Sequence, residues 1–188
     1  MRAIFLDRDG VLNENRPDYV KSWQEFRWLP GAREALAALA LQDVAIIVVT
    51  NQSMIGRGLV SAAGLDDIHR RMRQEAEAWG GRIDAVYACP HAPAEACRCR
   101  KPLPGLLLLA AAEHGIDLAG SVFVGDAFTD FQAAAAVAMP YVHIRSGLGP
   151  DEAAQVGAAN AHIPILASLS AAVPFCLPVP STLAALVG

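Results

Sequence analysis

The sequence predicts an α/β fold, a doubly wound, Rossmann-like parallel sheet with helices on both faces. Short apolar runs alternate with longer segments of helical periodicity, which is typical of right-handed βαβ units. The run VAIIVV at 44–49 is apolar throughout and rich in β-branched residues, as expected for a central strand buried on both faces. A length of 188 residues with 54% hydrophobic and 18% charged side chains suits one ordered domain and rules out a disordered chain.

Five strands are expected, each a short, mostly apolar run that is followed closely by polar residues. In order, they span 3–6, 44–49, 83–88, 121–124 and 141–144. Four helices are expected where apolar residues recur three or four positions apart. They span 31–41, 61–79, 104–114 and 129–138. Ser61 suits the N-cap of the second helix, and residues 10–30, punctuated by prolines, are expected to form a loop.

The chain beyond Asp151 has a less regular pattern. We expect residues 163–172 to add a strand and a turn of helix. Three prolines should then break regular structure before a last apolar stretch at 183–187. They are Pro174, Pro178 and Pro180. Cys176 has apolar neighbours, so we expect a small buried hydrophobic side chain.

Charge and hydropathy narrow the class of partner. The formal net charge is −4, whereas nucleic-acid-binding domains usually carry a basic patch. No stretch reaches the roughly 20 consecutive apolar residues that span a membrane. The first residues do not resemble a secretory signal. We therefore expect a cytoplasmic protein that binds neither nucleic acid nor membrane.

Charged and hydrogen-bonding side chains follow the expected strands. They are Asp7 and Asp9 after the first strand, Thr50 and Asn51 after the second, Lys101 beyond the third and Asp126 after the fourth. Each has an ordinary explanation alone, as a polar turn, a helix N-cap or a surface lysine. In a parallel α/β sheet, however, ligands bind beyond the carboxyl ends of the strands. Convergence at that edge is a stronger signal than any single residue.

These residue types together point to phosphoryl chemistry. Carboxylates that converge with one cation would repel unless a divalent cation neutralises them, and oxygen-only ligands suit Mg²⁺. Asp130 lies one helical turn after Asp126 and would add another carboxylate. Thr50 and Lys101 would supply the donor and the positive charge that a transferring phosphoryl group needs. One carboxylate could act as nucleophile, and a second acid two residues away could act as general acid and base.

Four segments resemble, in order, the four motifs of the haloacid dehalogenase superfamily of phosphatases. They are DRDGV at 7–11, TNQS at 50–53, RKP at 100–102 and GDAFTD at 125–130. The resemblance implies that Asp7 is the nucleophile and Asp9 the general acid/base. It also implies Mg²⁺ held by Asp7, the backbone carbonyl of Asp9 and Asp126, with Asp130 in support. Thr50 and Lys101 would stabilise the phosphoryl group.

A cluster of cysteines and one histidine precedes the third motif. Cys89, His91, Cys97 and Cys99 form the pattern C-x-H-x5-C-x-C. Three thiolates and one imidazole make a closed tetrahedral set of the kind that holds structural Zn²⁺. In a reducing compartment this clustering favours a metal over disulfides. The alternatives are free thiols or a Cys97/Cys99 pair open to oxidation, and we expect a zinc loop at 89–99.

A zinc loop directly before RKP is similar to two phosphatase families of the superfamily that lack a large cap domain. These are the D-glycero-D-manno-heptose 1,7-bisphosphate 7-phosphatases and the histidinol-phosphate phosphatases. TNQSMIGRG at 50–58 and RKPLPG at 100–105 favour the heptose family. That resemblance implies a phosphatase that removes the 7-phosphate through an aspartyl-phosphate, with a small phosphorylated sugar as its partner. From the length of the chain we expect a single domain over 1–188, and we expect a monomer. The residues implied around the substrate are Asn51, Gln52, Ser53, Arg57 and Arg100.

Some features depart from the heptose pattern. Ala127 stands where some of those enzymes have a lysine, Met54 stands where glycine is commoner, and the proline-rich tail 174–188 has no counterpart. The substrate and its anomer therefore stay open. Histidinol-phosphate phosphatase is the alternative enzyme. A phospho-acceptor signalling module, or a zinc-organised interaction protein with an inactive site, are the alternatives outside hydrolases.

Overall fold

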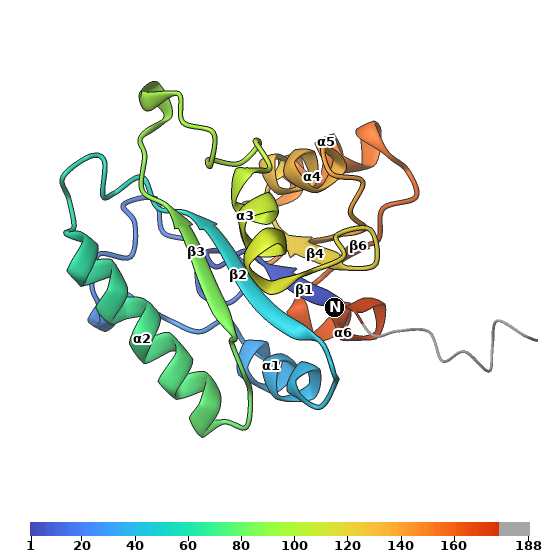
Figure 1. Ribbon diagram of the computed structural model, residues 1–188, viewed down its shortest axis with the longest axis horizontal. Helices are drawn as coiled ribbons and strands as arrows, with labels where there is room; N and C mark the ends of the chain where they lie inside the picture. The colour runs from blue at the N-terminus through green and yellow to red at the C-terminus, as the bar shows by residue number, and fades with distance from the viewer. Residues whose placement is uncertain (177–188) are drawn as a thin grey trace, which may run out of the picture.

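Six parallel strands form the centre of the computed structural model, which describes residues 1–176 (Figure 1). Their order across the sheet is β3-β2-β1-β4-β5-β6, and every neighbouring pair is parallel. The strands are β1 (Ala3–Leu6), β2 (Ala45–Asn51), β3 (Ala85–Cys89), β4 (Val122–Gly125), β5 (Tyr141–Ile144) and β6 (Ile165–Leu166). Strands β2 and β3 follow one another on one side of β1, and β4, β5 and β6 follow one another on its other side. The doubly wound fold predicted from the sequence is confirmed.

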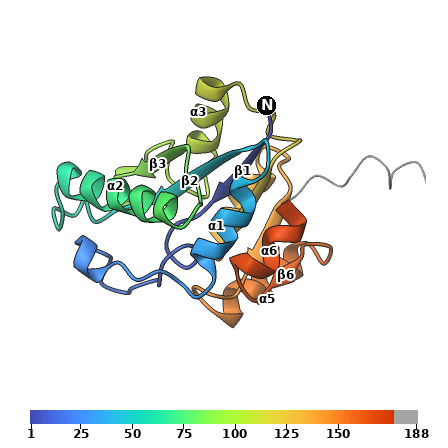
Figure 2. The ribbon, with the colours of Figure 1, turned by 90° about the horizontal axis from the view of Figure 1, so that it is seen from below.

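Helices cover both faces of the sheet (Figure 2). Those on one face are α1 (Ala32–Ala40), α2 (Ala62–Ala78) and α6 (Leu169–Cys176), and those on the other are α3 (Gly105–His114), α4 (Phe128–Ala135) and α5 (Pro150–Ala159). Two short 3-10 turns are η1 (Trp23–Glu25) and η2 (Pro93–Glu95). Alternate residues of β1 enter different layers: Ile4 and Leu6 pack with α1 and α2, whereas Phe5 packs with α3 and α4. Both faces of the central strands are therefore buried, which explains their continuous apolar runs.

The C-terminal part differs most from the sequence prediction. Helix α5 was not predicted, although Pro150 at its start and the acids Asp151 and Glu152 in its first turn are typical of a helix N-terminus. The prediction that Pro174 ends regular structure is wrong, because it lies inside α6. That helix is held by its buried face, in which Cys176 packs as the expected small hydrophobic side chain.

Other local predictions agree closely with the structure. Ser61 is the N-cap of α2, and its hydroxyl accepts a hydrogen bond from the Gly64 amide at 3.1 Å. The predicted strand and helical turn over 163–172 correspond to β6 and α6. The predictions for Pro178, Pro180 and 183–187 lie outside the described residues. Within residues 1–176, none of the helices has the length and apolar character needed to cross a bilayer.

Candidate active site

The predicted acids lie at the carboxyl ends of β1 and β4, where the winding of the sheet reverses. Leu6 of β1 is in register with Val124 of β4, so Asp7 and Asp126 follow two adjacent strands. This is the position at which open α/β sheets bind ligands. The local sequence places the side chains there because the apolar strands end at these residues and the chain then turns.

Three buried carboxylates and one buried ammonium meet at this edge. Lys101 Nζ lies 2.9 Å from Asp7 Oδ1 and 2.6 Å from Asp130 Oδ1. Burial raises the pKa of Asp7 to about 7, although the charge of Lys101 opposes this shift. Burial and the charges of Asp7 and Asp130 also raise the pKa of Asp126. Burial alone would lower the pKa of Lys101, but the charges of Asp130 and Asp7 raise it, so its ammonium remains protonated.

These carboxylates suit a divalent cation. Oxygen atoms of Asp7, Asp126 and Asp130 all lie within 4.8 Å of one another. One ammonium cannot neutralise three acids: burial is the main cause of the raised pKa values of Asp7 and Asp126, and the charges of the neighbouring acids add to it. A hard cation with oxygen ligands, such as Mg²⁺, would remove that repulsion. The arrangement therefore fits the predicted metal site.

The second motif supports the position of the lysine. Asn51 donates a hydrogen bond from its side-chain amide to the Lys101 carbonyl and accepts one from the Lys101 amide, both at 3.1 Å. Lys101 also donates to the Val49 carbonyl at 3.0 Å. Asn51 was predicted to lie near the substrate, and its contacts in the structure are with the backbone of the lysine. It therefore fixes the register between the second and third motifs.

Asp9 is held by several hydrogen-bond donors. Arg8 Nη2 lies 2.9 Å from both carboxylate oxygens, Asn13 donates to Oδ1 at 2.9 Å, and Gln52 donates to Oδ2 at 2.7 Å. Burial would raise the pKa of Asp9, but the charge of Arg8 and these hydrogen bonds lower it. Gln52 also donates to the Thr50 hydroxyl at 2.8 Å, so one amide joins the second acid to the second motif.

A loop after β5 that sequence reasoning missed completes the site. The Leu148 amide donates to Asp126 Oδ2 at 3.0 Å, and the Ser146 hydroxyl donates to the Gly10 carbonyl at 2.7 Å. A Cβ atom at Gly147 would lie only 1.7 Å from Asp126 Oδ2, so this position requires glycine. The segment RSGLG carries no acid, and its two glycines were the only available signal of a close approach to Asp126.

A cavity of about 240 Å³ opens over these groups. Its wall includes Arg100, as predicted, and also Arg16, which was not predicted. Ser53 is buried, and its hydroxyl lies 3.3 Å from the Tyr19 hydroxyl. Arg57 is exposed and is not part of the cavity wall. The structure thus brings the predicted acids, Lys101 and Arg100 together with Thr50, Asn51 and Gln52 in the wall of this cavity, but not Ser53 or Arg57.

A larger cavity of about 380 Å³ lies at the opposite end of the sheet. It is lined by residues near the start of β1 and β4, including Arg2 and Ser121, and none of the lining residues within 1–176 is acidic. The smaller cavity, with its converging charges, is therefore the candidate site.

The predicted zinc ligands lie in the loop beyond β3, which projects past the carboxyl ends of the strands (Figure 1). Cys99 Sγ lies 3.3 Å from Cys89 Sγ, 3.4 Å from Cys97 Sγ and 3.2 Å from His91 Nδ1. Four ligands about 2.3 Å from a tetrahedral zinc would be separated by roughly 3.8 Å. The sulfur atoms are too far apart for a disulfide. The four side chains therefore fit a closed zinc site.

Comparison with known proteins decides the family. Residues 98–172 match the HAD-hydrolase-like family model. The D-glycero-beta-D-manno-heptose-1,7-bisphosphate 7-phosphatase of Bordetella bronchiseptica is 42% identical over 157 residues, which cover 84% of this chain and 88% of that protein. The chain belongs to the heptose-1,7-bisphosphate 7-phosphatase family of the haloacid dehalogenase superfamily. The resemblance in the four motifs is thereby confirmed.

Solved and curated relatives extend this comparison. A crystal structure of D,D-heptose 1,7-bisphosphate phosphatase from B. bronchiseptica, complexed with magnesium and phosphate, has a TM-score of 0.88 and 39% identity and covers 93% of this chain and 97% of its own. The D-glycero-alpha-D-manno-heptose-1,7-bisphosphate 7-phosphatase of Mycobacterium tuberculosis is 43% identical over 138 residues, 72% of this chain and 73% of that protein. Relatives named for both anomers are therefore similarly close to this member of the family.

Proposed function

We propose that the protein is a Mg²⁺-dependent phosphatase that removes the 7-phosphate of D-glycero-D-manno-heptose 1,7-bisphosphate. The observation that carries the chemistry is the convergence of Asp7 with Lys101 and two further acids at the carboxyl edge of the sheet. The names of the relatives support the substrate, and the magnesium and phosphate in the Bordetella structure support the metal and the reacting group. Histidinol phosphate is the weaker candidate because the relatives considered above are named for heptose substrates.

The first chemical step would use both acids of the first motif. A carboxylate oxygen of Asp7 attacks phosphorus and forms an aspartyl-phosphate, while the bond between phosphorus and the sugar O7 breaks. Asp9 in its protonated form gives its proton to O7, so the sugar leaves as an alcohol. Lys101 and Thr50 would face the oxygens of the phosphoryl group as it transfers, because both residues line the cavity beside Asp7.

The second step reverses the role of Asp9. Its ionised carboxylate takes a proton from water, the resulting hydroxide attacks phosphorus, and the bond to Asp7 breaks to release inorganic phosphate. The donors around Asp9 lower its pKa and so favour the ionised form that this step requires. Asp9 returns to its protonated form and the cycle is complete.

Two metal ions belong to this proposal. Asp7, the backbone carbonyl of Asp9 and Asp126 would hold Mg²⁺, with Asp130 in support. When bound, this ion supplies positive charge that draws the phosphate to the carboxylates and neutralises its oxygens. The four ligands of the loop 89–99 would hold a structural Zn²⁺.

Loops, rather than a cap domain, would select the substrate. Arg100 reaches from the zinc loop into the cavity wall, and its guanidinium donates to the His91 carbonyl at 3.4 Å. Arg16 lies in the loop after the first motif. These cations could bind the phosphate that does not react. We further propose a single-domain monomer that works in the cytoplasm on a small phosphorylated sugar and has no nucleic-acid or membrane partner.

A comparison of substrates tests the function. Phosphate release is measured with Mg²⁺ for both anomers of the heptose bisphosphate and for histidinol phosphate. We expect the highest kcat/KM for one heptose anomer and no turnover by Asp7→Asn, which retains the shape of the side chain. Preferential turnover of histidinol phosphate, or a single phosphorylation without turnover, would overturn the proposal.

A further inference from the structure

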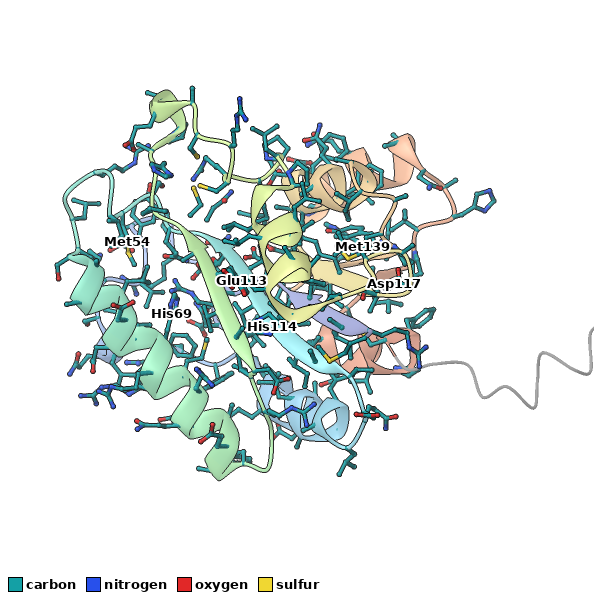
Figure 3. The ribbon with its side chains drawn as sticks, in the orientation of Figure 1. Met54, His69, Glu113, His114, Asp117 and Met139 are labelled. Atoms are coloured by element: carbon teal, nitrogen blue, oxygen red, sulfur yellow. The ribbon has the colours of Figure 1, made fainter. Side chains whose placement is uncertain are left out.

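A chain of polar contacts leads from Asp9 into the core beneath α2. The Arg8 side chain is almost fully buried, with 1% of its surface exposed. Its Nη2 contacts the Asp9 carboxylate, and its Nη1 lies 3.2 Å from Nε2 of His69. His69 is on the side of α2 that faces the sheet (Figure 3). A histidine 61 positions away in the sequence thus contacts the residue that holds the proposed general acid/base.

The direction of the Arg8–His69 hydrogen bond fixes the state of the ring. A guanidinium can only donate, so His69 Nε2 must accept and the ring must be neutral with its proton on Nδ1. Burial, together with the charge of Arg8, lowers the pKa of His69 to about 3. His69 therefore accepts the Arg8 hydrogen bond as a neutral ring and adds no charge beside the ion pair of Arg8 with Asp9.

Within the described residues, Arg8 has few other anchors. Its only ion pair is with Asp9, and its Nε has no hydrogen-bond partner. Without His69, Nη1 would lose the contact that sets the angle of the guanidinium plane, and a buried donor would be left unpaired. The guanidinium would then shift, and the Asp9 carboxylate would lose the one charged donor that contacts both of its oxygens, leaving Asn13 and Gln52 to hold it.

We propose that His69 is a positioning residue for the reaction: it anchors the Arg8 guanidinium, which in turn aims the Asp9 carboxylate at the leaving oxygen. This inference rests on the proposed phosphatase chemistry, because it assigns His69 a part in the proton transfer by Asp9. General acid/base catalysis typically contributes 10²- to 10⁴-fold to a rate, and a misdirected carboxylate would lose part of this factor.

The leaving group distinguishes positioning from folding. A sugar alkoxide needs a proton as it departs, whereas 4-nitrophenolate is a stable anion and does not. The ratio of kcat/KM for the heptose bisphosphate to kcat/KM for 4-nitrophenyl phosphate therefore reports the acid function of Asp9. We expect His69→Leu to lower this ratio by about 10- to 100-fold. We expect His69→Gln, whose amide oxygen can replace Nε2 as acceptor, to restore it to within about threefold.

Two reference variants make the result decisive. Ile68→Ala creates a packing defect next to His69 on α2, and we expect it to lower the Tm without changing the ratio, since Ile68 is buried in the apolar layer. Asp9→Asn should lower the ratio at least as much as His69→Leu.

If Asp9→Asn leaves the ratio unchanged, the proposed role of Asp9 fails. The inference about His69 is overturned if Asp9→Asn lowers the ratio but a folded His69→Leu leaves it unchanged. It is also overturned if His69→Gln lowers the ratio as much as His69→Leu does. If the wild type does not cleave the heptose bisphosphate, the proposed substrate fails, and the same ratio is measured with an alkyl phosphate that it does cleave.

Discussion

The ammonium of Lys101 is paired with the nucleophile candidate Asp7 at 2.9 Å, and both side chains are buried. The same ammonium also contacts Asp130 at 2.6 Å. It is thus a fixed positive charge placed among acids that would otherwise repel one another.

Replacing Lys101 by methionine keeps the length of the side chain and removes this charge. We expect kcat to fall by about 10²- to 10³-fold, because a donor to the transferring phosphoryl group is lost. Without the ammonium, the acids beside it would depend more on Mg²⁺ for neutralisation. A ligand that binds only the folded state stabilises it, so we also expect Mg²⁺ to raise the Tm more in Lys101→Met than in the wild type. Steady-state kinetics and thermal melts with and without Mg²⁺ measure both effects. Lys21→Met, which removes two ion pairs near the surface, with Asp18 and Glu25, is the control and should change neither.

Gly147, which lies beside Asp126, allows a steric test of whether the loop after β5 positions that carboxylate. Alanine at position 147 would place its Cβ against Asp126 Oδ2, so the carboxylate or the loop must move. We expect Gly147→Ala to lower kcat at least about tenfold and to lower stability by about 1–3 kcal/mol. Gly157→Ala is the matched control, because the nearest atom to its Cβ is Ile165 Cδ1 at 3.5 Å and it lies in α5. The control should be neutral or stabilise by up to about 1 kcal/mol. Equal effects of the two substitutions would contradict the role given to the loop.

The zinc proposal predicts metal content and stability together. We expect about one zinc per chain, since the four ligands form one closed set. Cys97→Ser should lose the metal and lower the Tm by about 5 °C or more, because zinc binding contributes to folding. Elemental analysis and thermal melts check this. Cys176→Ala removes a cysteine from the core instead and should retain the zinc. Wild-type protein that is fully stable without zinc would refute the structural metal.

The family resemblance places both Arg57 and Arg100 near the substrate, but the structure leads us to expect different effects when each is replaced. Arg100 lines the cavity, whereas Arg57 is exposed outside its wall. We expect Arg100→Ala to raise KM for the bisphosphate by about tenfold and to change KM for phenyl phosphate much less, because it would bind the distal phosphate. Arg57→Ala should have the smaller effect on the bisphosphate. A larger effect of Arg57→Ala would show that the loop carrying it closes over the substrate.

The sequence predicted those features that depend on local pattern. The strands were visible because their residues are apolar on both faces, and the acids after them stand in motifs whose order is specific. Helix α5 was missed because its first turn follows an irregular glycine-rich loop, although its proline and acids were visible.

Tertiary contacts could not be predicted in the same way. His69 has the spacing of an ordinary core residue of α2, and only the fold shows that its ring meets Arg8. The contacts of Leu148 with Asp126 and of Asn51 with Lys101 likewise join segments distant in sequence through backbone groups, which carry no residue-type signal.

The position of the released phosphate tests the central claim most directly. The protein is incubated with Mg²⁺ and D-glycero-D-manno-heptose 1,7-bisphosphate, and the products are followed by ³¹P NMR. The proposed function predicts inorganic phosphate and heptose 1-phosphate as the only products, with no reaction in Asp7→Asn. Release of the 1-phosphate, or an unchanged substrate in the presence of folded wild-type protein, would contradict it.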